Sequence, residues 1–442
     1  QFFTAQMVFP RTALPTELQE SYFFSVHLLS GSFFFQVSLS LAGIILSLLF
    51  SAGYWTKCVL PLCWYLLASA QFVNPLILQG GDVQLRLILL FSFFLPIEEW
   101  FSWDRRKIPT TQRRTTYESW ANTGFILQIS FVYWISAFGK MNGSWLNGLA
   151  LGEALQNSSH STLVGLALFD FINPWGLGIC AVAVLSIELF APFSFWLGWR
   201  ARRSGVICLV LLHALFALGL TITTFPWIAA SIALALLPSQ CFEREKVRTL
   251  KNLGRSRTWV NAVPLSLIFV VGLINLATLW PEKKRLIWRP LKPVIDVFQL
   301  QQNWTFFSRA NGWDWGFFRL IAVLPDGRVW GYFEEDFIDI SKIPERTSQV
   351  YPSMEWRRLF HALIRRDDAH VAPIGPSICQ RVRSIGAREI VVLHYYRRIS
   401  QPSPPSAYAQ REIMRYSCVD NRIMTLVKKA DNEAVFGPSK PD

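Results

Sequence analysis

A few ionisable side chains interrupt long apolar stretches of this sequence. Lys140 ends the aromatic-rich run "VYWISAFGK", Glu188 lies inside another apolar block, and His213 lies within "LVLLHALFALGL". A lysine that loses its hydration favours the neutral amine, which can accept a proton near neutral pH. Lys140 is therefore a candidate general base in a partly dry site.

A second interpretation of Lys140 is an anchor at a membrane surface. A lysine at a helix end normally extends its ammonium to the headgroups, and Tyr133 and Trp134 would then mark the interface. The segment that follows, "MNGSWLNGLALGEAL", contains three glycines and no basic residue. This composition favours a loop or half-helix that turns back into protein and lines a cavity, with Lys140 at its rim.

Each of the other polar positions also has a structural alternative. A carboxylate inside hydrocarbon is costly, so Glu188 must be protonated or partnered. His213 can serve as a helix-to-helix hydrogen bond without titrating. Asp82 and Arg86 stand four residues apart, a spacing that lets them pair on one helix face. Such a pair either fixes helix packing or faces a wet cavity.

The composition places these residues in a membrane protein. Hydrophobic residues make up 52% of the chain of 442 residues, and charged residues only 17%. The mean hydropathy is positive, at +0.28. The net charge of +13 does not indicate nucleic acid, because much of the excess Lys and Arg lies in short loops between apolar blocks.

Hydropathy predicts a polytopic α-helical membrane protein with about eight spans. Pro226 supplies a break in an apolar block that is too long for one crossing, so this block is divided into two helices. The predicted spans lie near residues 31–53, 58–73, 83–97, 120–138, 175–197, 205–221, 227–237 and 262–280.

Basic loops predict the orientation of these spans. Arg and Lys cluster after residue 104, after residue 199 and between residues 244 and 257, so these three loops should be cytoplasmic. The stretch 141–174 has no Lys or Arg and should lie on the other side. We therefore expect a multi-pass protein of the inner (cytoplasmic) membrane, with everything after Trp280 on the external or periplasmic side.

The chain changes character after residue 281. We predict a transmembrane domain over 1–281 and a small external α+β domain over 282–442. Within it, "LIAVLPDGRVWGYF" indicates two strands joined at Pro325, "REIVVLHYYRRI" indicates another strand, and "SMEWRRLFHALIRR" has helical spacing. Residues 401–406 belong to a proline-rich loop.

The seven cysteines form no CxxC pair, so no metal site is predicted. Cys379 and Cys418 both fall in the predicted external domain. They can form a disulfide if that compartment is oxidising.

Several segments together resemble a known family. These are "YFFSVHLLSGSFFFQ", "NPLILQGGDVQLRLILLFSFFLP", "VYWISAFGKMNGSWLNGLAL", "LHALFALGLTITTFPWIAASIALALLP" and "LQQNWTFF". Their order and spacing resemble HTTM (horizontally transferred transmembrane) domain proteins, the bacterial relatives of vitamin K-dependent gamma-carboxylase. The resemblance implies one further helix before "VFPRT", so the natural protein is expected to be longer.

The same resemblance suggests a chemical role for two residues. In the carboxylase branch a lysine deprotonates a bound hydroquinone, and Lys140 matches that lysine through the pattern it forms with Trp145, Gly148 and Ala150. His213 matches the histidine of a later helix. Two departures separate this chain from the carboxylases. Gly139 stands where they tend to carry a basic residue, and the tail is too short to reproduce their substrate-binding region.

Three functions are therefore weighed. The first is an enzyme that binds a quinol or another lipid-like substrate, with Lys140 and His213 as catalytic residues. Its predicted substrate- or lipid-binding residues are Asp82, Arg86, Trp145 and Glu188. The cofactor is left open, with a reduced quinone as the candidate. The second is a non-catalytic accessory subunit or assembly factor that contacts membrane lipid and docks a protein partner through the external domain. Transport ranks last, because no inverted repeat is evident.

Overall fold

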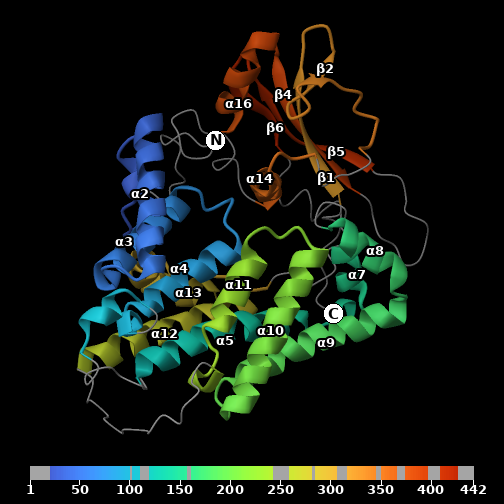
Figure 1. The fold of residues 1–442 in the computed structure, drawn as a ribbon. Coiled ribbons are helices and arrows are strands. Elements are labelled where there is room, and N and C mark those ends of the chain that lie inside the picture. The colour runs from blue at the N-terminus through green and yellow to red at the C-terminus, as the bar shows by residue number, and fades with distance from the viewer. Residues whose placement is uncertain are drawn as a thin grey trace.

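A helical part and a smaller sheet-containing part make up the molecule (Figure 1). A computed structural model provides the fold. It describes residues 20–99, 102–109, 119–156, 161–241, 258–280, 284–305, 316–344, 350–365, 374–396 and 409–426. The predicted proline-rich loop at 401–406 lies outside these residues.

Each of the eight predicted spans corresponds to a helix. These helices are α2 (Phe33–Ala52), α3 (Thr56–Val73), α4 (Gly80–Ser92), α5 (Trp120–Lys140), α9 (Pro174–Ser194), α10 (Trp199–Gly219), α11 (Phe225–Leu234) and α12 (Thr258–Leu279). Among the described residues, six of them are long and apolar enough to cross a membrane. The other two are α4 with 13 residues and α11 with 10. The predicted count of about eight spans is therefore not confirmed.

The outer surface of the long helices suggests a multi-pass membrane protein. Phe34 and Leu48 on α2 are 81% and 65% exposed, and Ile179 and Phe190 on α9 are 71% and 64% exposed. Bulky apolar side chains exposed in such numbers suit contact with lipid chains rather than water.

The long apolar block around Pro226 is divided, as the sequence predicts. Helix α10 ends at Gly219, and α11 begins at Phe225 with the proline in its first turn. A proline is tolerated there because the first N–H groups of a helix have no intrahelical acceptor.

Three short helices follow α5 in place of a long loop. They are α6 (Gly143–Leu146), α7 (Leu149–Gln156) and α8 (Leu163–Phe171). Ala150, Leu155 and Trp145 of this segment share a buried cluster with Leu177 and Ala181 of α9. The segment is therefore folded against the helices, as its glycine-rich, lysine-free composition suggests.

The core of the helical part includes residues that lie beyond the last apolar helix. Helix α13 (Lys284–Val297) contributes Ile295 to this core, and the segment after it contributes Leu300 and Trp304. These three side chains have no exposed surface. The predicted division after residue 281 thus falls before residues that pack with the helices.

The C-terminal part is an antiparallel sheet packed against helices. Its strands are β1 (Gly316–Val323), β2 (Val329–Gly331), β3 (Asp336–Phe337), β4 (Glu389–Tyr396), β5 (Ala409–Ser417) and β6 (Arg422–Leu426). They are ordered β3-β2-β1-β4-β5-β6. Helices α14 (Met354–Arg365) and α16 (Ile374–Val382) share the sheet's apolar core. The predicted α+β organisation is confirmed, including the two strands joined near Pro325.

Helix α14 of the sheet part contacts the helical part. Arg358 Nη1 donates to the backbone oxygen of Ile77, in the loop between α3 and α4, at 3.0 Å. Leu76 of the same loop packs against the apolar core of the sheet part. Burial lowers the pKa of the Arg358 guanidinium to about 10, although the charges of Asp82 and Glu355 oppose this shift.

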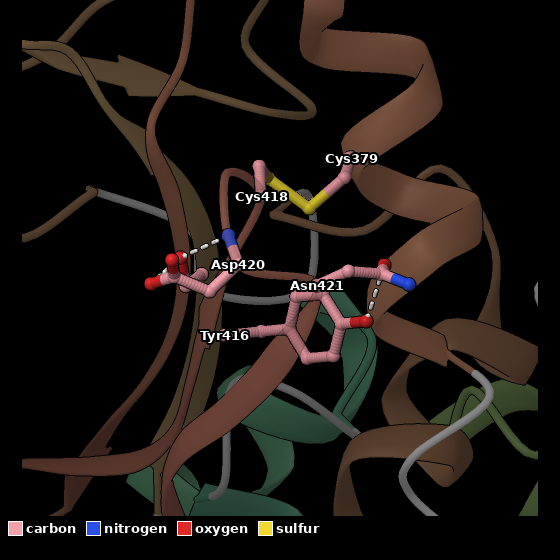
Figure 2. Close-up of a disulfide and its surroundings, with 6 residues drawn as sticks. Cys379, Tyr416, Cys418, Asp420 and Asn421 are labelled. Atoms are coloured by element: carbon pink, nitrogen blue, oxygen red, sulfur yellow. Dashed lines mark hydrogen bonds between the residues drawn. A yellow bond between two sulfur atoms is a disulfide. The ribbon is translucent and has the colours of Figure 1, made fainter.

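A disulfide joins Cys379 of α16 to Cys418, the residue after β5 (Figure 2). The Tyr416 hydroxyl nearby donates to Asn421 Oδ1 at 2.7 Å, which closes the turn between β5 and β6. The expected pairing of the two cysteines is found. Disulfides persist mainly in oxidising compartments.

A Cys379→Ser/Cys418→Ser variant should lose about 2–5 kcal/mol of the stability of the C-terminal part, because the bond constrains the unfolded chain. Thermal unfolding of the full chain in detergent, with and without reductant, measures the loss. Replacing the exposed Cys58 by Ser is the matched control. An unfolding temperature that reductant leaves unchanged would show that the bond contributes nothing.

Candidate functional site

Lys140 forms a buried ion pair with Glu188. The ammonium Nζ lies 2.8 Å from Oε1 and 2.7 Å from Oε2 of the Glu188 carboxylate. The two residues are only 4% and 5% exposed. The last turn of α5 is thereby joined to α9.

Ser136 and Trp145 complete the immediate surroundings of the ammonium. Ser136 stands one turn before Lys140 on α5, and its hydroxyl accepts from Nζ at 2.5 Å. The centre of the Trp145 ring lies 5.2 Å from Nζ, within the range of a cation–π contact. The Trp145 indole donates to the backbone oxygen of Ala181, which fixes the ring against α9.

Gly148 allows the segment that carries Trp145 to lie close to α9. Its φ is +80°, a left-handed conformation that favours glycine. A Cβ at this position would lie 2.5 Å from the backbone nitrogen of Gly178 and 2.6 Å from the carbonyl carbon of Leu177. Only glycine fits here without a shift of α9.

A Gly148→Ala variant is therefore expected to lose at least about 1–3 kcal/mol, through the backbone conformation alone. Thermal unfolding of the purified protein measures this loss. Gly143→Ala is the matched control, because no atom lies within 4 Å of a Cβ at that glycine. Equal unfolding temperatures for the two variants would contradict the close approach of residue 148 to α9.

A second polar contact lies along the same helix. The Tyr133 hydroxyl and His213 Nε2 are 2.9 Å apart, so α5 and α10 share a buried hydrogen bond. Tyr133 stands seven residues before Lys140, about 10 Å along the helix axis and on the same face. The rings of Phe216 and Phe225 surround the imidazole.

The His213 imidazole keeps one nitrogen without a hydrogen-bond partner among the described residues, Nδ1. This nitrogen can accept or donate a proton, depending on the tautomer. His213 thus meets the prediction of a hydrogen bond between helices and retains one position for a ligand.

Asp82 and Arg86 share α4 but take different partners. Asp82 Oδ2 accepts from the backbone nitrogen of Gln79 at 2.8 Å and caps the helix. Arg86 donates to Gln71 Oε1 at 2.6 Å and to the Gln301 backbone oxygen at 3.0 Å. In the described part of the chain these two charges do not form the ion pair that their spacing permits.

The structure brings together three of the six predicted site residues, namely Lys140, Trp145 and Glu188. His213 of α10 contacts α5 at Tyr133, about two turns before Lys140. Asp82 and Arg86 belong to a separate group around α3 and α4. Sequence reasoning missed Ser136 and the partner of His213. The alternative reading of Lys140 as a surface anchor made Tyr133 an interface marker, but Tyr133 is only 3% exposed. The sequence signal for both was the spacing of 136 and 133 from Lys140, four and seven residues, on one helix face.

The Lys140 site can exchange a proton internally. Transfer from the ammonium to the Glu188 carboxylate would convert a charged pair into an amine and a carboxylic acid with the same net charge. Either form is compatible with burial when the two groups remain in contact. Among the described residues, no group of three or more His, Cys, Asp or Glu side chains is arranged to hold a metal ion.

Long apolar helices that enclose a buried ion pair define a multi-pass helical membrane protein with a polar interior site. The model of the HTTM domain family matches residues 22–239, which include Lys140, Glu188 and His213. The chain therefore carries an HTTM domain over these residues, which suggests a membrane protein related to carboxylase-like proteins. No curated protein and no solved structure matches it.

Proposed function

We propose that this protein binds a quinol or a similar lipid-like substrate and uses Lys140 as the base. The observation that supports this proposal is the burial of the Lys140 ammonium against Glu188, with Ser136 and Trp145 beside it. The Glu188 carboxylate is in direct contact with the ammonium and is placed to receive its proton, which would leave a neutral amine beside Ser136 and Trp145.

The proposed step begins with proton transfer from Lys140 Nζ to Glu188 over 2.7 Å. The neutral amine then takes the proton of a quinol hydroxyl. The resulting ammonium pairs with the quinolate oxygen, while Glu188 stays protonated. The quinolate then leaves and Glu188 releases its proton to solvent, which restores the ion pair between the Lys140 ammonium and the Glu188 carboxylate.

Burial of the pair makes the choice of variant important. Lys140→Ala alone would leave Glu188 buried without a partner and would unfold the site. The Lys140→Met/Glu188→Gln double variant removes both charges and keeps the shapes. We expect this variant to insert and fold but to leave a quinol unchanged.

The test compares this double variant with the unmodified chain in nanodiscs. A short-chain naphthoquinol is supplied, and its oxidation by oxygen is followed by absorbance, because the quinolate reacts faster than the quinol. Lys57→Met is the matched control, since Lys57 pairs with Glu98 at an exposed position. Equal rates for the unmodified chain, the double variant and quinol alone would reject Lys140 as the base.

One observation favours the non-catalytic alternative. The ammonium of Lys140 has three donors, and two Glu188 contacts and one Ser136 contact engage it fully. A saturated ion pair between helices suits a structural role in an accessory subunit. Purification in a mild detergent tests this alternative: a stoichiometric protein partner supports it, and a single-component sample that turns over the quinol rejects it.

We also propose the inner membrane as the location, with the C-terminal part on the external side. The disulfide between Cys379 and Cys418 supports an oxidising compartment for that part. At the opposite end of the helices, Lys57 contacts Glu98. The Asp104 carboxylate accepts from the Thr56 backbone nitrogen, which places the basic residues Arg105 to Lys107 at the same end. Basic loops at that end support a cytoplasmic side.

A further inference from the structure

Arg86 is a buried guanidinium that forms no ion pair among the described residues. The residue is 2% exposed, and its hydrogen-bond acceptors are the side-chain oxygen of Gln71 and the backbone oxygen of Gln301. Both acceptors are uncharged. The third position of the guanidinium, Nε, has no hydrogen-bond partner among the described residues.

Asp82, the nearest acid on the same helix, is committed elsewhere. Its Oδ2 accepts from the Gln79 backbone nitrogen, and its charge acts on Arg358 of α14 as well as on Arg86. It forms no ion pair with Arg86 within the described residues. An arginine cannot release its proton at neutral pH as a lysine can, so the charge of Arg86 persists.

The surroundings of Arg86 are polar and assembled from four parts of the chain. Gln71 comes from α3 and Arg86 from α4, while Gln128 of α5 donates to Gln302 at 3.2 Å. Gln302 also accepts from the Trp304 indole at 2.7 Å. The amides and Trp304 hold the segment 301–304 against α4 and α5, and so fix the position of the guanidinium.

We propose that Arg86 anchors a binding site for a small monoanionic oxyanion, of which a carboxylate is the simplest form. A monoanion would place a negative charge in direct contact with the guanidinium, a contact that Asp82 does not make, and the planar guanidinium matches the geometry of a carboxylate. The unpartnered Nε supplies a donor for that anion. Arg86 lies one turn below Asp82, which is at the end of α4 nearest to α14.

This site is distinct from the one proposed around Lys140. Gln128 and Lys140 are 12 residues apart on α5, about 18 Å along its axis. The anion site does not depend on Lys140 acting as a base, so either proposal can fail without the other.

The test uses the full chain in phosphatidylcholine nanodiscs, with thermal unfolding followed by tryptophan fluorescence. Sodium acetate is titrated against sodium chloride at equal ionic strength. We expect acetate to raise the unfolding temperature saturably and more than chloride does. Arg86→Gln should remove this rise without lowering the unfolding temperature in acetate-free buffer, because it also removes an unbalanced buried charge.

Two further variants make the result independent of how Arg86→Gln folds. Gln71→Glu places a carboxylate beside Arg86 and should abolish the response to acetate by supplying the counter-charge. Arg328→Gln, at an exposed ion pair with Asp326, should leave the response unchanged. An acetate response that survives in Gln71→Glu would overturn the proposal. So would equal responses to acetate and chloride in the unmodified chain, when phosphatidylglycerol nanodiscs also give no rise that needs Arg86.

A last arm separates the two sources of such an anion. Nanodiscs that contain phosphatidylglycerol offer a lipid phosphodiester in place of acetate. A rise in unfolding temperature that needs Arg86 and occurs only in these nanodiscs assigns the site to a lipid headgroup. A rise with acetate in phosphatidylcholine alone assigns it to a small soluble carboxylate.

Discussion

Lys140→Met is expected to lower the free energy of unfolding by about 3–5 kcal/mol, because it leaves the Glu188 carboxylate buried without its partner. The carboxylate is held by Nζ at 2.7 and 2.8 Å. Removal of the ammonium also leaves the Ser136 hydroxyl without its donor. Thermal and denaturant unfolding of the purified chain in detergent measure the loss.

The double variant Lys140→Met/Glu188→Gln should recover most of this loss. Replacement of both members of a buried ion pair by groups of similar size is often close to neutral, because the cost of removing two charges from water disappears with the attraction between them. Such a recovery would show that the loss in Lys140→Met comes from the unpaired Glu188 charge and not from poor packing of the methionine.

Lys57→Met provides the matched comparison at an ion pair whose lysine is exposed. Lys57 and Glu98 are 2.8 Å apart, but the lysine side chain is 78% exposed, so the change should cost about 0–1 kcal/mol. If Lys140→Met were no less stable than Lys57→Met, the Lys140–Glu188 pair would not hold α5 and α9 together in the folded protein.

Hydropathy and turn chemistry were enough to predict the positions of the eight apolar helices and of α14, the break at Pro226 and the strands on either side of Pro325. Each depends on residues close in the sequence. The lengths of α4 and α11 were less predictable, because apolar residues continue beyond the end of each helix. The predicted third span runs to residue 97, whereas α4 ends at Ser92.

The pairing of Lys140 with Glu188 could not be predicted in the same way. The two residues are 48 positions apart, and their contact depends on how α5 and α9 rotate about their axes. Sequence reasoning required Glu188 to be protonated or partnered and made Lys140 a candidate base in a partly dry site, but it treated the two residues separately. The Lys140 ammonium is the partner of the Glu188 carboxylate, and the carboxylate in turn makes burial of the ammonium possible. The lysine is therefore both buried and ion-paired.

The burial of Trp304 could not be predicted from hydropathy. It follows two glutamines in "LQQNW", a polar segment that gives no hydropathy signal for burial in a membrane domain. The structure nevertheless places Trp304 and Leu300 in the core of the helices. The glutamines are tolerated because Gln302 accepts from the Trp304 indole and from Gln128 of α5.

Trp304→Ala should therefore lower the free energy of unfolding of the helical part by about 3–5 kcal/mol. The side chain has no exposed surface, so its removal opens a cavity between α13 and the helices. The change also removes the donor to Gln302. Trp304→Phe, which keeps most of the ring volume, should cost less. Thermal unfolding in detergent and the rate of proteolysis after residue 280 measure the effect.

Trp175→Ala is the matched control for this prediction, because Trp175 on α9 is 86% exposed and contributes little to the core. A large loss for Trp304→Ala and a small loss for Trp175→Ala would show that residues beyond the last apolar helix are part of the membrane domain. Equal small losses would show that the segment 299–305 only lies beside the helices. The domain boundary after residue 281, as predicted from the sequence, would then separate the two folding units of the chain.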